Sequence, residues 1–131
     1  MKIAIATDDG KTISQHFGRA THYMVVTLEQ GKIVSREMRD KLNHDHFAGE
    51  EHAHEPGQPH GFDPASQSRH ARMIESIRDC EAMVCRGMGM GAYESLRYLN
   101  IRPILTEIKD VDKAVTAYLD GSITDQPERL H

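Results

Sequence analysis

Residues 81–92 are the stretch that most constrains the fold of this 131-residue chain. Ala82 to Cys85 is a short apolar run, too brief for a helix and bounded by charge and glycine. Three glycines follow this run, at Gly87, Gly89 and Gly91. The order predicts a buried strand, a turn in which glycine lets the backbone bend, and a helix that begins at about Met90. Free N–H groups at such a helix start suit an anion.

The rest of the chain predicts an α/β domain around this unit. Strands are expected over residues 2–7, 21–28, 32–39, 82–85 and 101–107, and helices from Asp63 to about Cys80, Met90 to Asn100 and Asp110 to Gly121. Hairpin and crossover geometry then give a three-layer fold with a five-stranded mixed sheet of order 3-2-1-4-5, whose second strand is antiparallel. We therefore expect a single domain over residues 1–121, with a His-rich polar loop at 40–62 and a flexible tail over 122–131.

This topology brings several segments to the carboxyl ends of the parallel strands, where open α/β sheets bind ligands. They are the loop that contains His16 and Arg19, the loop at 40–62, and the glycine turn after Cys85. The glycine turn, the helix start and Arg86 together favour a negatively charged ligand, such as a phosphate or a metal–sulfur cluster.

The loop at 40–62 contains five histidines interleaved with acidic side chains. They are His44, His46, His52, His54 and His60. Two His-x-His pairs place imidazoles on the same side of an extended chain, and neutral imidazole binds zinc, nickel, copper and iron. The same composition is typical of a solvated, disordered loop. The two interpretations are compatible, so a divalent-metal site, for zinc or nickel, is one hypothesis for this loop.

His16 and Cys85 each have two interpretations. His16 can bind a metal or can hydrogen-bond a loop carbonyl. A thiolate at Cys85 would be favoured by the helix start and by Arg86, whereas a buried cysteine commonly acts as a small hydrophobic residue. Cys80 lies at the opposite end of the strand, so we expect no disulfide between the two cysteines. Arg19 can bind an anionic ligand or pair with a neighbouring aspartate.

Composition and motifs narrow the classes of function. A net charge of −4 disfavours a nucleic-acid-binding protein, and no apolar run is long enough for a membrane span. No nucleophile–base pair can be read from the spacing, so we expect a protein that is not an enzyme. The pattern Gly87-x-Gly89-x-x-Ala92, with Glu107, also matches the dinucleotide fingerprint and leaves a nucleotide-binding regulator as an alternative. Two cysteines and the absence of a visible signal peptide indicate a cytoplasmic protein.

Three segments form a characteristic combination: Met1–Thr7, Ser14–Ala20 with its His-Phe-Gly-Arg sequence, and Cys85–Ala92. They resemble the dinitrogenase iron–molybdenum cofactor biosynthesis family, which includes NifX-like and NafY-like carriers. The resemblance covers most of residues 1–120 outside the loop at 40–62. It implies a ribonuclease H-like fold and a protein that binds or carries an iron–sulfur or iron–molybdenum cofactor, or a precursor, without catalysing a reaction.

The residues and the resemblance together predict a carrier for an anionic cluster. The predicted cofactor-binding residues are His16, Arg19, Cys85, Arg86, Gly87, Gly89 and Gly91. The partner would be a protein that donates or accepts the cluster, and the chain would be a monomer or weak homodimer. The His-rich loop departs from the family pattern and leaves a simple cation as another cargo. With only two cysteines, the chain lacks the cysteine triplet of the radical enzyme that builds the cofactor precursor.

Overall fold

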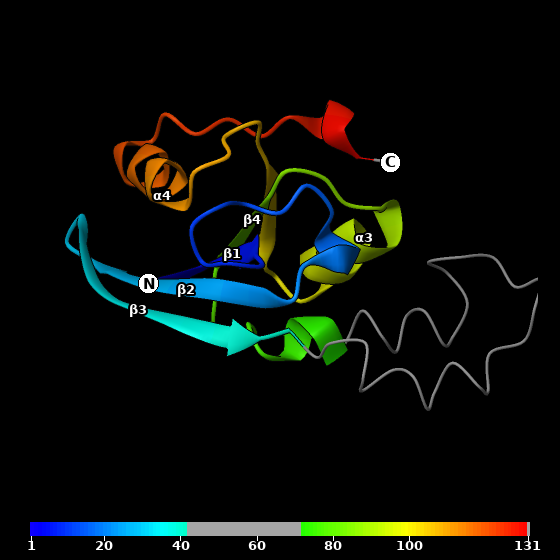
Figure 1. The fold of residues 1–131 in the computed structure, drawn as a ribbon, viewed down its shortest axis with the longest axis horizontal. Coiled ribbons are helices and arrows are strands. Elements are labelled where there is room, and N and C mark those ends of the chain that lie inside the picture. Colours follow the sequence, from blue (N-terminus) through cyan, green and yellow to red (C-terminus); the bar gives the residue numbers. More distant parts are fainter. Residues whose placement is uncertain (42–71, 131) are drawn as a thin grey trace, which may run out of the picture.

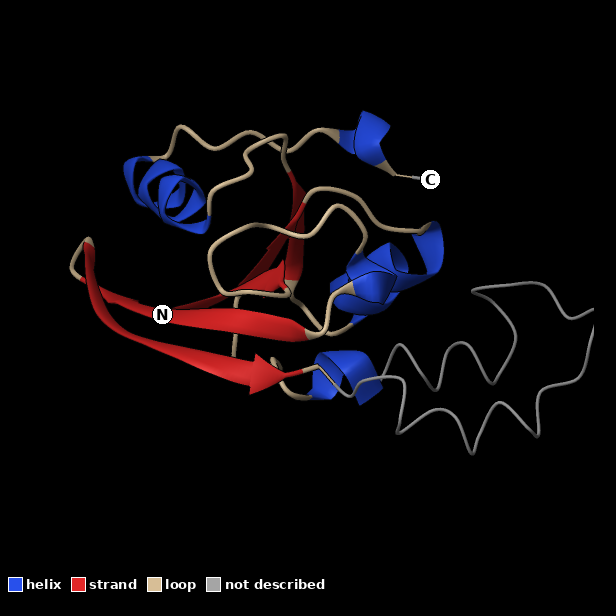
Figure 2. Cartoon of the chain, viewed as in Figure 1, coloured by secondary structure: helices blue, strands red, loops and turns tan. Residues whose placement is uncertain are grey.

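The computed structural model describes residues 1–41 and 72–130, which form a five-stranded sheet with helices on both faces (Figures 1 and 2). The strands are β1 (Lys2–Thr7), β2 (His22–Glu29), β3 (Lys32–Asp40), β4 (Ala82–Cys85) and β5 (Arg102–Leu105). Their order in the sheet is β3-β2-β1-β4-β5. β2 runs antiparallel to both of its neighbours, whereas β1, β4 and β5 are parallel. The predicted strand order and the antiparallel second strand are confirmed.

The α-helices whose two ends both lie in the described residues are α3 (Met90–Tyr98) and α4 (Val111–Asp120). The same residues also contain two 3₁₀ turns, η1 (Phe17–Arg19) and η2 (Pro127–Arg129). The Asp110 carboxylate caps α4 by accepting a hydrogen bond from the Lys113 N–H at 3.0 Å, and Gly121 ends α4 with a left-handed φ of 77°. The predicted helix from Asp63 to about Cys80 falls partly outside the described residues. Of its described part, residues 72–75 are helical, whereas residues 76–79 form turns and Cys80 is not helical. Nowhere in the described ranges is a helix long and apolar enough to cross a membrane.

The central strand β1 is buried on both faces because its side chains alternate between two core clusters. Ala4 and Ala6 belong to the cluster that contains α3, and Ile3 and Ile5 belong to the cluster that contains α4. The neighbouring strand β4 alternates in the same way. α3 and the 72–75 helix therefore cover one face of the sheet, and α4 covers the other (Figure 2). A nearly continuous apolar strand is what burial on both faces requires.

β5 is an edge strand whose outer side is covered by the end of the chain. Pro103 has no N–H to expose at this edge. The Leu105 N–H donates to Asp125 Oδ1 at 2.9 Å, and the Leu105 carbonyl accepts from the Gln126 N–H at 2.8 Å. The sequence predicts a flexible tail over residues 122–131, whereas in the structure the described part of this segment, residues 122–130, is tied to the sheet. The reason is that it satisfies backbone groups that an edge strand would otherwise leave unpaired.

Arg39 links β3 to the segment that precedes β4. Its guanidinium donates to both carboxylate oxygens of Asp79, at 2.7 and 3.0 Å, and to the Ser76 carbonyl at 2.7 Å. Lys2 adds a bond to Asp79 at 3.1 Å. The hydrogen bonds from Arg39 hold the pKa of the Asp79 carboxyl well below its usual range. This pair fastens an edge strand to the chain segment that covers one face of the sheet.

We expect Asp79→Asn to lower the free energy of unfolding at pH 7 by about 1–2 kcal/mol, since solvent screens the half-exposed carboxylate. The folded pKa of Asp79 lies below its unfolded value of 3.8. As the pH falls, the unfolded chain therefore binds the proton first, and the wild-type protein loses this stability below about pH 4. Urea unfolding at pH 7 and pH 3 measures the effect, and the difference between the two proteins should shrink at pH 3.

Glu75→Gln is the matched control, because Glu75 forms an exposed pair with Arg78 at 3.6 Å. Such pairs contribute little, so this variant should unfold almost as the wild type does. An equal loss of stability in both variants would show that the Arg39–Asp79 pair contributes no more to the free energy of unfolding than an exposed ion pair does.

Candidate functional site

The loop that carries His16 and the glycine turn after β4 meet at one end of the sheet. The Phe17 N–H donates to the Gly87 carbonyl at 2.9 Å, and the Arg86 N–H donates to the Ser14 carbonyl at 3.0 Å. The Phe17 side chain is buried in the core and anchors the loop. Two segments far apart in the sequence are thus joined by reciprocal backbone bonds. Their predicted meeting at the carboxyl ends of the parallel strands is confirmed.

An open depression of about 370 Å³ lies where these segments meet, and we call it the rim site. Its lining residues are Gln15, His16, Arg86, Gly87, Glu128, Arg129 and Leu130. The side chain of His16 is exposed. Two guanidinium groups, from Arg86 and Arg129, outnumber the single carboxylate of Glu128. A hollow lined by an excess of one charge concentrates ligands of the opposite charge, so the rim site suits an anion.

Arg86 carries a hydrogen-bond donor that the described residues leave unmatched. Its Nε is buried and has no partner in the described ranges. Buried donors are nearly always paired in native proteins, and an unpaired one costs about 1–3 kcal/mol. An anion bound beside this guanidinium would supply acceptor atoms. The residues present therefore fit a negatively charged ligand.

Lys41 lies beneath η1, the turn that follows His16. Its buried ammonium donates to the carbonyls of Phe17 and Ala20, the latter at 3.3 Å, and lies 4.2 Å from the centre of the Phe17 ring. Burial lowers the pKa of Lys41 to about 8. Within η1 the Phe17 carbonyl also accepts a hydrogen bond from the Ala20 N–H at 3.3 Å. Lys41 therefore adds a second donor to the Phe17 carbonyl, pairs the Ala20 carbonyl, and holds the end of η1.

Cys85 lies beneath the rim site and does not line it. Its side chain is fully buried, and its thiol donates to the carbonyls of Ser14 and Gly87 at 3.3 and 3.2 Å. Burial raises the pKa of the Cys85 thiol, and the nearby cations do not compensate. Of the two interpretations of Cys85, the structure therefore favours the packed, neutral cysteine over the thiolate. Cys80 and Cys85 are both free, as predicted.

The structure brings together three of the seven predicted cofactor-binding residues in the rim site, namely His16, Arg86 and Gly87. Gly89 is the N-cap of α3, Gly91 lies in its first turn, and neither lines the rim site. Arg19 is exposed in η1 and does not line it either.

The predicted role of glycine in bending this turn is not borne out by the backbone angles. In the described ranges, the glycines with positive φ are Gly10, Gly31 and Gly121. The turn after β4 therefore has no left-handed residue, and Gly89 itself is extended, with φ −80° and ψ 162°. The conformation of this turn is one that other residues can adopt.

The histidines predicted as metal ligands in the loop at 40–62 fall outside the described residues. They are His44, His46, His52, His54 and His60. Within residues 1–41 and 72–130, no three His, Cys, Asp or Glu side chains come together as a metal site would require.

Four lining residues were not predicted from the sequence: Gln15, Glu128, Arg129 and Leu130. Three of them belong to the segment predicted as a flexible tail. The sequence offers one local signal, Pro127, which favours the first position of a helical turn and begins η2. Pro127 predicts a turn but not its place in the fold, so the contribution of this segment to the rim site follows from the tertiary structure alone.

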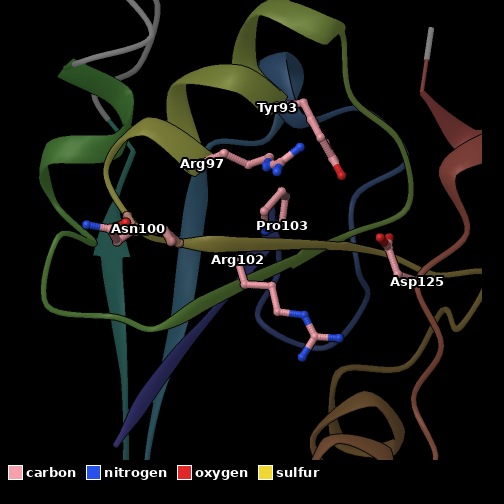
Figure 3. Close-up of a pocket in the computed structure, with 7 residues that line it drawn as sticks. Tyr93, Arg97, Asn100, Arg102, Pro103 and Asp125 are labelled. Atoms are coloured by element: carbon pink, nitrogen blue, oxygen red, sulfur yellow. The ribbon is translucent and has the colours of Figure 1, made fainter.

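A second depression, of about 360 Å³, lies along β5 and the end of α3 (Figure 3). Its lining residues are Tyr93, Arg97, Asn100, Ile101, Arg102, Pro103 and Asp125. The Arg97 guanidinium lies 5.8 Å from the centre of the Tyr93 ring, as in a cation–π pair. None of the residues predicted from the sequence to bind a cofactor lines this depression. The rim site is therefore the better candidate.

The fold and the rim site define a small α/β domain that can accept an anion at the carboxyl ends of its parallel strands. The chain belongs to the dinitrogenase iron–molybdenum cofactor family, whose model matches residues 1–121. The resemblance found in the sequence is therefore confirmed.

Two relatives and one solved structure are similar to most of this chain. An uncharacterised protein of Methanocaldococcus jannaschii is 25% identical over 123 residues, which are 94% of this chain and 89% of that protein. The FeMo cofactor biosynthesis protein NifB of Frankia alni is 30% identical over 125 residues, which are 95% of this chain but only 22% of that protein. The apo form of the orange protein from Desulfovibrio gigas has a TM-score of 0.65 at 18% identity, with 96% of this chain and 92% of that chain covered. This last similarity concerns the fold alone.

Proposed function

We propose that this protein binds or carries an anionic cofactor of the iron–sulfur or iron–molybdenum type, or a precursor of one, and does not catalyse a reaction itself. The observation that carries the proposal is the pair of reciprocal backbone bonds that sets His16 beside Arg86. Membership of the iron–molybdenum cofactor family supports the metal–sulfur nature of the ligand.

Each lining residue has a role in this proposal. The imidazole of His16 would bind a metal of the cluster, since neutral imidazole is a ligand for iron. Arg86 would balance the negative charge and supply hydrogen-bond donors, including its unmatched Nε. Any redox chemistry belongs to the cofactor and is used after delivery. Cys85 would support the site from below and would not act as a ligand.

The proposal extends to the setting of the protein. Its partner would be a protein that donates or accepts the cluster, and the chain would act in the cytoplasm as a monomer or weak homodimer. In this proposal the fold is of the ribonuclease H type that the family resemblance implies.

Anaerobic reconstitution with iron, sulfide and molybdate tests the proposal. We expect metal, sulfide and a visible absorption band to elute together with the protein after gel filtration, because the rim site would hold the cluster by ligation and charge. Elution of the protein without a chromophore, with all metal in the small-molecule fractions, would contradict the proposal.

A second candidate is a divalent-metal binding protein that acts through the five histidines at 44–60. Deletion of residues 43–61 distinguishes the two. It should abolish zinc or nickel binding if the loop alone is the site, and it should leave cluster reconstitution largely intact if the rim site holds the cofactor. A nucleotide-binding regulator, the third candidate, would instead show a higher melting temperature with added nucleotide.

A further inference from the structure

The C-terminal tail, residues 122–130, passes the ends of β4 and β5 and reaches the loop that leads into α3 (Figure 1). Hydrogen bonds at Leu105 fasten its start to β5. At its far end, Leu130 forms a parallel bridge with Met88 and packs against the core cluster beneath α3. The family match ends at residue 121, so the tail lies beyond the part of the chain that the family describes.

Between these attachments, η2 places Arg129 beside Arg86. The Arg129 Nε donates to Gln126 Oε1 at 2.7 Å, and its Nη1 donates to the Arg86 carbonyl at 3.5 Å. A guanidinium has five N–H donors, and these two contacts orient the group while using only a part of them. Arg129 is half-buried, so its position is restricted before any ligand binds.

We infer that the tail forms one wall of the rim site and that Arg129 is its second anion-binding cation. The inference rests on the proposed function. Two guanidinium groups that line one depression suit a ligand with two or more negative charges spread over several sulfur or oxygen atoms. Glu128 lines the same depression and opposes such a ligand. Of these two neighbouring tail residues, Arg129 therefore strengthens the binding of an anion and Glu128 weakens it.

This opposition gives a matched pair of variants in the full-length chain. The probe is tetrathiomolybdate, a coloured dianion of molybdenum and sulfide, titrated by visible absorption at low salt. We expect Arg129→Gln to weaken binding by about 3- to 10-fold and Glu128→Gln to strengthen it by about 2- to 3-fold, since each change alters one partly exposed charge. Arg129→Lys should recover part of the affinity, and all differences should shrink at high salt.

Arg78→Gln is the control, because it removes an exposed arginine that does not line the rim site. The exchange rate of the Leu105 amide, which Asp125 protects, shows whether the tail remains docked in each variant. A tail that is docked in Arg129→Gln, together with weaker binding, supports a direct role for the charge. In the wild-type chain, a shift of the Arg129 Nε–Hε signal on addition of the probe gives a second, independent readout.

The outcomes separate the inference from the proposed function. Wild-type affinity in Arg129→Gln, or no shift of the Arg129 signal while the probe binds, overturns the inference and leaves the proposed function standing. No binding of the probe by the wild-type chain, together with failed reconstitution, overturns both.

Discussion

His16→Ala is expected to remove the visible chromophore from the reconstituted protein. His16 is the only imidazole that lines the rim site in the described residues, so the variant would lose the proposed metal ligand while the backbone bonds of the loop remain. Loss of outer-shell partners of a metal already costs about 10- to 100-fold in affinity, and loss of the ligand itself should cost at least as much. Metal content and visible absorption after gel filtration measure the effect.

Two further variants test the assignment of the ligand. His22→Gln is the matched histidine control, because His22 pairs with Asp40 at 2.9 Å and does not line the rim site. Cys85→Ala removes a thiol that is fully buried and hydrogen-bonded to backbone carbonyls. Both variants should keep the chromophore. If Cys85→Ala loses it and His16→Ala keeps it, the ligand is the cysteine and our assignment is wrong.

Lys41→Met is expected to have the largest effect on stability, and that effect should depend strongly on pH. The variant leaves the carbonyls of Phe17 and Ala20 without their side-chain donor, which costs about 1–3 kcal/mol. It also removes the unfavourable free energy of desolvating a buried ammonium group. At neutral pH these two effects oppose each other, so we expect a modest net change. At high pH the wild-type lysine is neutral, and only the loss of the donor remains.

The direction of the pH dependence follows from the two pKa values of Lys41. The folded value is about 8 and the unfolded value is 10.5, because burial disfavours the charged form. Between these values the unfolded chain binds a proton that the folded chain does not, so this group increases stability as the pH rises from about 8 to about 10.5. The difference in the free energy of unfolding between the wild type and Lys41→Met should therefore increase in favour of the wild type over this window, by up to about 3 kcal/mol.

Urea unfolding of both proteins at pH 7, 8.5 and 10 measures this difference. Burial raises the pKa values of Tyr23 and Cys85, and their ionisation lowers stability in alkali, but they are present in both proteins and largely cancel in the comparison. A difference that stays constant, or narrows as the pH rises, would show that Lys41 is not desolvated in the folded protein.

Much of the fold can be predicted from the sequence because local patterns specify it. The nearly continuous apolar run of β1 requires cover on both faces, the polar side chains of β3 indicate an edge, and Pro103 indicates the other edge. Asp110 and Gly121 mark the ends of α4. Once hairpin and crossover geometry give the strand directions, the meeting of the His16 loop with the turn after β4 follows as well.

Other features were not predictable because they depend on contacts between distant segments. The charge of Cys85 is decided by the burial of its thiol, which outweighs the nearby helix start and Arg86. In the sequence, Lys41 is an ordinary polar residue after β3 with no sign of burial. Only the fold places its ammonium under η1.

The sequence by itself therefore determined the sheet, its strand order and the end of the sheet at which the His16 loop meets the turn after β4, since periodicity and turn residues act over a few positions. Only the tertiary structure decided which side chains line that end. The tail, with Arg129, reaches the rim site because its hydrogen bonds at Leu105 and its bridge at Met88 satisfy backbone groups that a free end would leave exposed. Desolvation and long-range pairing of this kind have no local signature in the chain.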